Sequence, residues 1–239
     1  MRRLDQLLAA RGFGSRKEVS ALVRAGLVQV NGQATRDAAQ KINPAQDHVT
    51  LHGREVDLRE FIYVMLHKPQ GVVSASRDAK DATVLDILPQ SLRRRGLFPV
   101  GRLDKDSTGL LLITDDGALA HALLSPRRHV PKVYLATLRH AVAQADIAAF
   151  VAGLALPGGE MCLPAELVPL GSNMARVVLH EGKFHQVKRM FASIGNEVLA
   201  LHRESMGGLN LDESLAPGDC RELFEKELQM LKQTANLPR

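Results

Sequence analysis

The sequence predicts an α+β fold, in which a small N-terminal module precedes a larger unit with a mixed, mainly antiparallel sheet. Two observations lead to this expectation. Residues 1–59 contain two helical patterns and a few short strand patterns, which suit a compact module. From residue 60 onward, strand-like and helix-like segments alternate without the regular spacing of βαβ units, which favours a mainly antiparallel α+β sheet.

The N-terminal module begins with two helical patterns. Leucines recur at helical spacing over residues 4–8 and predict a short amphipathic helix. Ser15 followed by Glu18 is a capping-box pattern, in which each side chain satisfies a free backbone N–H at a helix start. Gly26 is a natural C-terminal stop, so we expect a second helix between these points.

Short strands complete the module. Valines alternate over residues 28–30 and run into Asn31-Gly32, a strong hairpin signal. Residues 49–51 predict another strand. The linker is expected over residues 58–61, which divides the chain into a module of residues 1–59 and a domain of residues 60–239.

The second domain opens with the apolar run 61–66, which ends in a turn-rich stretch. Further strands are expected at residues 72–73, 110–113, 133–138, 167–170 and 175–179, and helices at residues 119–124, 143–151 and 186–194. Asp115-Asp116-Gly117 has the pattern of a turn with an N-cap in front of the first of these helices.

The composition is that of an ordinary soluble globular protein, with 45% hydrophobic and 24% charged residues. No apolar run approaches the roughly 18 residues that indicate a membrane span. The N-terminus lacks the apolar core of a signal peptide. Cys162 and Cys220 are too few and too scattered for a disulfide framework or a zinc site. We therefore expect a cytoplasmic protein.

The net charge of +5 suggests an anionic partner. Basic residues cluster at 93–95, 127–132 and 183–189. Any single cluster is equally well explained as solvated surface, but three of them around one candidate site favour a nucleic-acid path. Aromatic residues are only 4% of the chain and Trp is absent, so a broad stacking platform for single strands is not expected.

The segment GRLDKDSTGLLLITDDG, residues 101–117, holds the strongest candidate for chemistry. It places Asp104 near Arg102 in a bend-rich stretch directly before the apolar run 110–113. Asp104 would then lie just outside a rigid sheet, and the neighbouring cation would favour its ionised form. Such a carboxylate can act as a nucleophile or general base, whereas a turn Asp taken alone more often caps its own backbone.

The segment HEGKFHQVKRMF, residues 180–191, supplies a candidate partner. A helix is expected to begin near His185, and Lys188 follows one turn later. Lys188 could reach an active-site carboxylate or belong to a solvated basic face. Leu179 ends the preceding strand and would ordinarily be a core residue.

The segment PKVYL, residues 131–135, adds Tyr134 and Lys132, which share a face by the two-residue period of a strand. A buried Tyr with a satisfied hydroxyl is the commoner explanation of such a pattern. A Tyr that stacks on a base beside a Lys that contacts phosphate is the functional one.

Basic side chains also gather on the first helix and at the start of the second, at Arg2, Arg3, Arg11, Arg16, Lys17 and Arg24. They form either a solvated face or an RNA-backbone contact, since helix N-termini and arginines both favour phosphate. The order of elements in this module resembles the small RNA-binding domain called the alpha-L motif, which makes Arg16 and Lys17 candidate RNA contacts.

Three segments together carry a closer resemblance. They resemble the RsuA-type branch of ribosomal RNA pseudouridine synthases. The segments are GRLDKDSTGLLLITDDG, PKVYLATL and EGKFHQVKRMFASIGNEVLALHRESMGGLNL. The likeness covers nearly the whole chain, including the N-terminal module. The GRLD segment is highly specific to pseudouridine synthases, and HQVKRM favours the enzyme of the small ribosomal subunit.

The resemblance implies a role for each matching residue. Asp104 would be the catalytic carboxylate, Lys188 would pair with it, and Tyr134 would stack on the uracil. Leu179 would pack beneath the base, and Arg102 would fill the space left by it or hold the RNA backbone. The remaining substrate-binding candidates are Lys132, Arg189, Arg16 and Lys17.

The implied reaction detaches uracil from its sugar, rotates it and rejoins it through carbon, so no cofactor and no metal are expected. The expected partner is 16S ribosomal RNA or a small-subunit assembly intermediate, with uridine 516 as the target and a monomeric enzyme. Three alternatives stay open: the same chemistry on 23S RNA, a non-catalytic RNA-binding assembly factor, and a metal-dependent phosphodiesterase using Asp104, Asp106 and Asp116.

Overall fold

The computed structural model describes residues 1–44, 46–93 and 96–237. The chain forms two compact units, the first comprising residues 1–62 with 90–97 and the second residues 63–89 with 98–239. Arg94 and Arg95, which belong to one of the basic clusters, lie outside the described residues.

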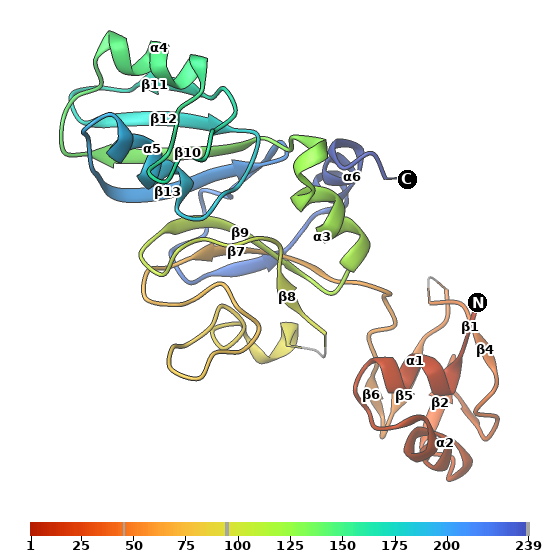
Figure 1. Cartoon of the computed structure of the whole chain (residues 1–239). Coiled ribbons are helices and arrows are strands. Elements are labelled where there is room, and N and C mark those ends of the chain that lie inside the picture. Colours follow the sequence, from red (N-terminus) through yellow and green to blue (C-terminus); the bar gives the residue numbers. More distant parts are fainter. Residues whose placement is uncertain (45, 94–95, 238–239) are drawn as a thin grey trace. The chain divides into compact units, whose positions relative to one another are not determined.

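The first unit combines two helices with two small sheets (Figure 1). A four-stranded antiparallel sheet has the order β3-β2-β5-β6, and β1 pairs with β4. The bounds are β1 Arg2–Arg3, α1 Leu4–Ala10, α2 Arg16–Arg24, β2 Val28–Val30, β3 Gln33–Thr35, β4 Lys41–Ile42, β5 Val49–Leu51 and β6 Arg54–Glu55. Apolar residues of α1, α2 and the strands form one buried cluster.

Local sequence explains these elements. Ser15 caps α2 and Glu18 returns a bond to the Ser15 N–H, so the predicted capping box is confirmed. Asn31 and Gly32 have φ of 51° and 80°, the left-handed pair that a type I′ turn requires between β2 and β3. The predicted helices and hairpin of this unit are therefore confirmed.

The second unit is built on a mixed sheet of nine strands in the described part of the chain. Its main order is β11-β12-β10-β13-β9-β7-β15, with β14 paired to β13 and β8 paired to β9. The bounds are β7 Tyr63–Lys68, β8 Phe98–Pro99, β9 Thr108–Thr114, β10 Lys132–Leu138, β11 Glu166–Pro169, β12 Met174–Leu179, β13 Val198–Met206, β14 Leu209–Asn210 and β15 Cys220–Glu222. Neighbours run antiparallel except β13 and β9, which are parallel, so the predicted fold class is confirmed.

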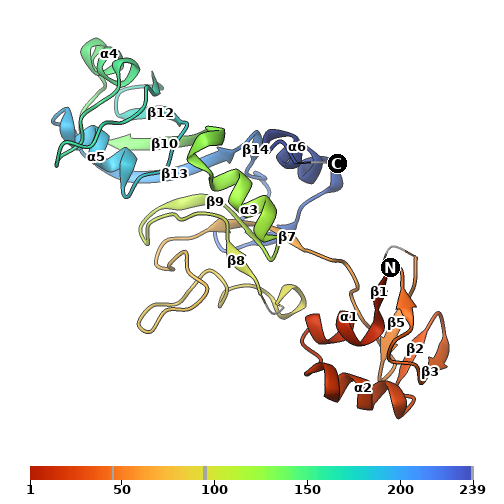
Figure 2. The same ribbon diagram turned by 45° about the vertical axis from the view of Figure 1, so that its right-hand side comes forward.

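Helices cover this sheet (Figure 2). Their bounds are α3 Gly117–Leu124, α4 Gln144–Ala152, α5 Gln186–Ser193 and α6 Glu225–Thr234, with a short 3-10 turn at Pro126–Arg128. A second 3-10 turn, Gln90–Leu92, belongs to the first unit. Figures 1 and 2 both show α3 beside α6, and their apolar residues join one core cluster with β9 and β14. Asp116 caps α3 by accepting the N–H of Leu119, as the Asp115-Asp116-Gly117 pattern predicts.

Some elements differ from expectation. The predicted strand at residues 72–73 is wrong, because Val73 forms only an isolated bridge with Thr83 inside a long loop. The central strand β13, the strand β15 and the helix α6 are not predicted by the apolar pattern. In β13 a fully buried arginine, Arg203, occupies a core position, so the strand lacks the apolar alternation that would identify it.

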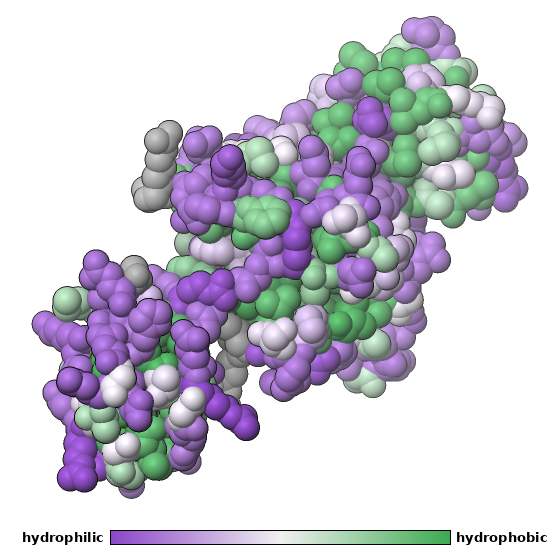
Figure 3. Space-filling view, turned by 180° about the vertical axis from the view of Figure 1, so that it is seen from behind, coloured by the Kyte–Doolittle hydropathy of each residue, from purple (hydrophilic) through white to green (hydrophobic). Residues whose placement is uncertain are grey.

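On the face that Figure 3 shows, hydrophilic residues cover much of the surface and hydrophobic residues lie between them. Within the described residues no helix is long and apolar enough to cross a membrane.

Candidate active site

Asp104 lies on the loop between β8 and β9, as predicted, directly before the buried strand. Its carbonyl oxygen accepts the N–H of Ser107 at 3.1 Å, which closes a tight turn. The hydroxyl of Ser74 both donates to the Leu103 carbonyl at 2.8 Å and accepts the Leu103 N–H at 3.0 Å. The loop is therefore anchored on each side of the carboxylate.

Lys68, at the end of β7, binds the backbone of the same loop. Its side chain is fully buried, and Nζ donates to the carbonyl oxygens of Ser107 at 2.8 Å and Pro69 at 3.0 Å. Burial lowers the pKa of Lys68 to about 8, although the charges of Asp106 and Asp104 oppose this shift. The buried Lys68 side chain thus fixes the backbone of the loop that carries Asp104, through the carbonyl of Ser107.

Two side chains from the start of α5 reach the carboxylate of Asp104. Lys188 Nζ lies 3.1 Å from Oδ2, and His185 Nε2 lies 3.2 Å from Oδ1. Burial alone would lower the pKa of Lys188, but hydrogen bonds and charges from Asp106 and Asp104 raise it above its ordinary value. Lys188 therefore stays charged and pairs with Asp104, as the resemblance implies.

Asp106 shares the same lysine. Its Oδ1 lies 2.6 Å from Lys188 Nζ, and this hydrogen bond lowers the pKa of Asp106. The side chain of Asp106 is 70% exposed, whereas that of Asp104 is 24% exposed. Of the two carboxylates, Asp104 is the one shielded from water.

Arg102 does not supply the cation that the sequence suggested for Asp104. It is exposed, and within the described residues it forms no ion pair or hydrogen bond with that carboxylate. The charge partners of Asp104 come from α5 instead.

Asp104 lines a cavity of about 670 Å³. Tyr134 of β10 and Leu179 of β12 line it together with Arg102 and Lys132, so the structure brings these predicted residues together. Tyr134 is 8% and Leu179 2% exposed. The other residues on its wall include Ser107, Phe184, His185, Leu201 and Arg203.

Lys132 lies deeper than a surface phosphate contact would. It is 8% exposed, and its Nζ donates to the carbonyl of Val130 at 3.0 Å. Burial, with a smaller effect from the nearby charge of Arg203, lowers the pKa of Lys132 to about 8. Lys132 therefore contributes positive charge to the interior of the cavity.

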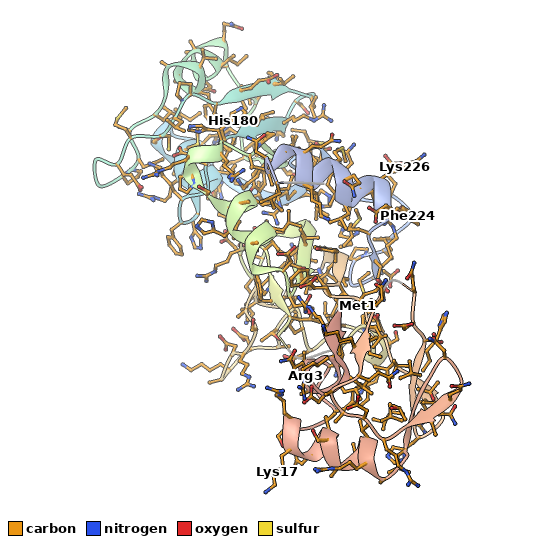
Figure 4. All side chains as sticks on the ribbon, turned by 90° about the vertical axis from the view of Figure 1, so that its right-hand side faces the viewer. Met1, Arg3, Lys17, His180, Phe224 and Lys226 are labelled. Carbon is orange, nitrogen blue, oxygen red and sulfur yellow. The ribbon has the colours of Figure 1, made fainter. Side chains whose placement is uncertain are left out.

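The other predicted binding residues lie elsewhere. Arg189 does not line the cavity, since its guanidinium pairs with Glu160 at 3.1 Å and donates to the Pro157 carbonyl. Arg16 and Lys17 belong to the first unit, where they line a shallow groove with other basic side chains of α2. Lys17 projects outward from α2 (Figure 4), and Arg16 pairs with Asp5 at 3.1 Å.

Four residues near the site were not singled out from the sequence as site residues: His185, Phe184, Lys68 and Arg203. Phe184 is 71% exposed and stacks on the His185 ring with centroids 3.8 Å apart. The sequence signal for it is an aromatic residue inside a basic run, between Lys183 and His185, which is a pattern suited to base contact. The positions of Lys68 and Arg203 depend on strand pairings distant in sequence, so local patterns carry no signal for them.

The metal-dependent alternative does not fit this geometry. Asp116 is 7% exposed, caps α3 and accepts the Tyr63 hydroxyl at 2.8 Å, away from the cavity. Across the part of the chain that the structure describes, no three His, Cys, Asp or Glu side chains form a group that could hold a metal ion. What the site offers is the Asp104 carboxylate in contact with a lysine and a histidine, and a cavity lined by Tyr134. A second shielded carboxylate of the cavity, Glu181, is already paired with Lys183 and Gln186.

A carboxylate paired with a lysine at a cavity, in a mixed-sheet domain that follows a small basic module along the chain, fits the class of RNA-modifying enzymes. The family model described as RNA pseudouridylate synthase matches residues 62–159, and the S4 domain model matches residues 2–49. The chain belongs to the RNA pseudouridine synthase family and carries an N-terminal S4 domain.

Relatives match over almost the full length. An uncharacterized RNA pseudouridine synthase of Bacillus subtilis, YtzG, is 47% identical over 97% of this chain and 98% of its own. Ribosomal small subunit pseudouridine synthase A of Escherichia coli is 41% identical over 95% of this chain and 98% of its own. A crystal structure of a pseudouridylate synthase superposes with a TM-score of 0.68 at 36% identity, covering 97% of this chain and all of the other.

Proposed function

We propose that this protein isomerises a uridine of 16S ribosomal RNA, expected at uridine 516, to pseudouridine, with Asp104 as the catalytic carboxylate and no cofactor. The observation that carries the proposal is the pair of Asp104 and Lys188, 3.1 Å apart at a cavity walled by Tyr134 and Leu179. Relatives named for the small ribosomal subunit support the choice of RNA.

The geometry supports a division of labour. Lys188 and His185 hold the Asp104 carboxylate in place, with Lys188 Nζ 3.1 Å and His185 Nε2 3.2 Å from its oxygens. Tyr134 stacks on the extracted uracil, Leu179 packs beneath it, and exposed Arg102 holds the RNA from the rim. Extraction of the base costs a few kcal/mol of stacking, by analogy with base flipping in DNA, and contacts to phosphate offset it.

The two parts of the chain would act together. Residues 1–59 bind RNA through the basic face of α2, including Arg16 and Lys17, and residues 60–239 carry the catalytic site. Arg189 supports the α5 start through its pair with Glu160, and the enzyme acts as a cytoplasmic monomer on RNA or an assembling particle. Because phosphate contacts release counterions, RNA affinity should fall as salt rises.

The decisive experiment is a reverse-transcription stop assay after carbodiimide labelling of small- and large-subunit RNA transcripts. Wild type should create one stop in small-subunit RNA, and Asp104→Ala should abolish it. Asp104→Asn should also abolish the stop while leaving RNA affinity nearly unchanged, which separates an enzyme from a pure binding factor.

Asp106→Asn is the matched control, because it removes a carboxylate two positions away that shares Lys188 but is 70% exposed. It should retain most of the product. A stop only in large-subunit RNA would keep the chemistry and overturn the substrate. The absence of any stop, on naked RNA and on assembling particles alike, would favour the non-catalytic assembly factor.

A further inference from the structure

Two buried polar groups of the active-site cavity have no hydrogen-bond partner. Among the described residues, three buried side-chain atoms are without one: Nη2 of Arg203, Oγ of Ser107 and Oγ1 of Thr50. Arg203 and Ser107 both line the cavity beside Asp104, whereas Thr50 lies on β5 in the other unit. Unpaired buried groups are costly and rare, so two at one cavity indicate a ligand that satisfies them.

Arg203 is held rigidly. It is 2% exposed, and its Nε donates to the carbonyl of Leu110 at 2.7 Å. In the sheet it lies between Tyr134 on β10 and Gly109 on β9. A Cβ at Gly109 would lie 2.3 Å from the Arg203 carbonyl oxygen, so only glycine permits this close approach. The guanidinium is therefore fixed at the cavity lining, where its Nη2 has no hydrogen-bond partner among the described residues.

Ser107 is equally well placed. It is fully buried, its N–H donates to the Asp104 carbonyl at 3.1 Å, and its own carbonyl accepts Lys68 Nζ at 2.8 Å. The backbone on which the hydroxyl sits is thus fixed in the same turn as the catalytic carboxylate. The hydroxyl can donate or accept, according to the group it meets.

Basic residues outnumber acidic ones on the cavity lining, with Arg102, Lys105, Lys132, Lys183 and Arg203 against Asp81, Asp104 and Glu181. Burial and the charge of Arg203 lower the pKa of Lys132 to about 8, and Arg203 acts on Lys68 in the same direction. Asp104 also lines the cavity, but in the described structure it forms no ion pair with Arg203 or Lys132. An acceptor group that gains negative charge would be stabilised here.

Uracil is such a group. It offers two carbonyl acceptors and one N–H donor along its edge. When the N1–C1′ bond breaks, its electron pair stays with the ring, and the negative charge spreads onto the two carbonyl oxygens. Meanwhile C1′ either bonds to an Asp104 carboxylate oxygen or forms a double bond to C2′ as the C2′ proton passes to that carboxylate. The charge is discharged when C5 bonds to C1′, the Asp104 bond breaks or the C2′ proton returns, and the C5 proton moves to N1.

We propose that Arg203 donates through Nη2 to a carbonyl oxygen of the extracted uracil, and that the Ser107 hydroxyl pairs with an adjacent polar group of the same base. Together they recognise uracil and stabilise the charge it gains on detachment. The proposal rests on the proposed function and adds two residues to its site. If the oxygen that Arg203 contacts is O4, cytosine would turn an amino donor toward a donor there, so this contact would also select the base.

The test combines atom changes in the RNA with side-chain changes in the full chain. Synthetic RNA fragments carry uridine, 2-thiouridine or 4-thiouridine at the position located by the reverse-transcription assay, because sulfur is a weaker acceptor than oxygen. Single-turnover rates are measured for wild type, Arg203→Gln, Arg203→Lys and Ser107→Ala, with thermal unfolding and RNA affinity as checks of the fold. Thr50→Val is the matched control, since it removes an unpaired buried hydroxyl outside the cavity.

With uridine, Arg203→Gln should lower the rate about 10- to 100-fold, as expected for a hydrogen bond to a charged group, and Ser107→Ala about 2- to 10-fold. Arg203→Lys should lose less than Arg203→Gln, and Thr50→Val should match wild type. The thio substitution at the carbonyl that Arg203 contacts should slow wild type. The same substitution should have much less effect in Arg203→Gln, because this variant already lacks the Nη2 hydrogen bond.

Full and independent effects of both thio substitutions in Arg203→Gln would overturn the assignment. If Arg203→Gln does not fold, the same comparison with Ser107→Ala and Arg203→Lys decides. Product in wild type without any such coupling would refute this inference alone. Absence of product in wild type with unmodified RNA would instead refute the proposed function.

Discussion

Lys188 is bound to two carboxylates of unequal exposure, and this inequality makes its role measurable. Replacement by Met leaves Asp104 beside His185 alone and removes the charge that pairs with the carboxylate and orients it. We expect Lys188→Met to lower the single-turnover rate at least about 100-fold, in line with the loss of a preorganised charge partner.

Lys188→Arg keeps the charge and should recover part of that rate, although its planar fork alters the geometry. Release of the C5 hydrogen from RNA tritiated at uridine C5 measures both variants. Equal rates for Met and Arg would show that charge at this position is irrelevant to catalysis.

Tyr134 offers a second residue-level separation, between its ring and its hydroxyl. The ring lines the cavity, and within the described residues the hydroxyl has no hydrogen-bond partner. Stacking requires only the ring, so Tyr134→Phe should retain most of the activity. Tyr134→Ala should lose roughly 1–3 kcal/mol of base stacking, a factor of about 5 to 150 in rate. The same tritium-release assay compares the two, and a severe loss in Tyr134→Phe would assign the hydroxyl a part in proton transfer.

At the scale of elements, the parallel pairing of β9 with β13 brings Asp104 and Arg203 to one cavity, and it depends on Gly109. Gly109 has φ of 106°, and an added Cβ would meet the Arg203 backbone at 2.3 Å. Gly109→Ala must therefore separate the two strands. We expect a loss of more than about 3 kcal/mol in unfolding free energy, from strain and broken packing together.

Gly117→Ala is the comparison, because Gly117 begins α3 and nothing lies within 4 Å of an added Cβ. It should be neutral or slightly stabilising, since alanine restricts the unfolded chain. Urea unfolding followed by tyrosine fluorescence suits both variants, because Tyr63 and Tyr134 are the two tyrosines and both lie in the second unit. Similar stabilities for the two variants would contradict the close approach.

Elements with strong local patterns were predictable from the sequence. The strand at 110–113 is all apolar, the Ser15 to Glu18 capping box starts α2, and the helix after His185 follows a glycine-containing loop; each is confirmed. The loop position of Asp104 and its pairing with Lys188 followed from these elements and from family resemblance.

Elements defined by distant contacts were not predictable. β13 carries Arg203 at a buried position and Glu204 beside it, so its polar residues resemble a surface segment. Arg203 becomes buried only because β9 and β10 flank it. In α6, Leu231 is the single fully buried residue among many charged ones, which gives a weak helical stripe. The unpaired Arg203 nitrogen could not be anticipated for the same reason.

At the scale of the whole molecule, the buried lysines make stability depend on pH. Lys132 and Lys68 have pKa values lowered to about 8 from the ordinary 10.5. Between these values the folded state binds fewer protons than the unfolded state, so these groups raise stability as pH increases from about 8 toward 10.5. Below pH 8 both lysines are charged, and their burial is unfavourable.

Lys132→Met should therefore flatten the dependence of unfolding free energy on pH between 7 and 9.5, with the largest gain relative to wild type near pH 7. Urea unfolding followed by circular dichroism at several pH values measures this, because a phenol with the ordinary pKa of about 10 begins to ionise near pH 9.5 and would alter tyrosine fluorescence. Parallel pH curves for wild type and variant would show that Lys132 titrates normally.

The pairing of β9 with β13 also has a consequence for when activity can arise during synthesis. The Arg203 side chain bonds to the Leu110 carbonyl, 93 positions earlier in the chain. Closing so long a loop is slow compared with local hairpin formation, and a ribosome delivers residue 104 well before residue 203. A nascent chain therefore contains the loop of Asp104 long before it contains Arg203, which completes the lining of the cavity. We expect such a chain to bind RNA through its first module while still unable to modify it, so that competence arrives only with the last third of the polypeptide.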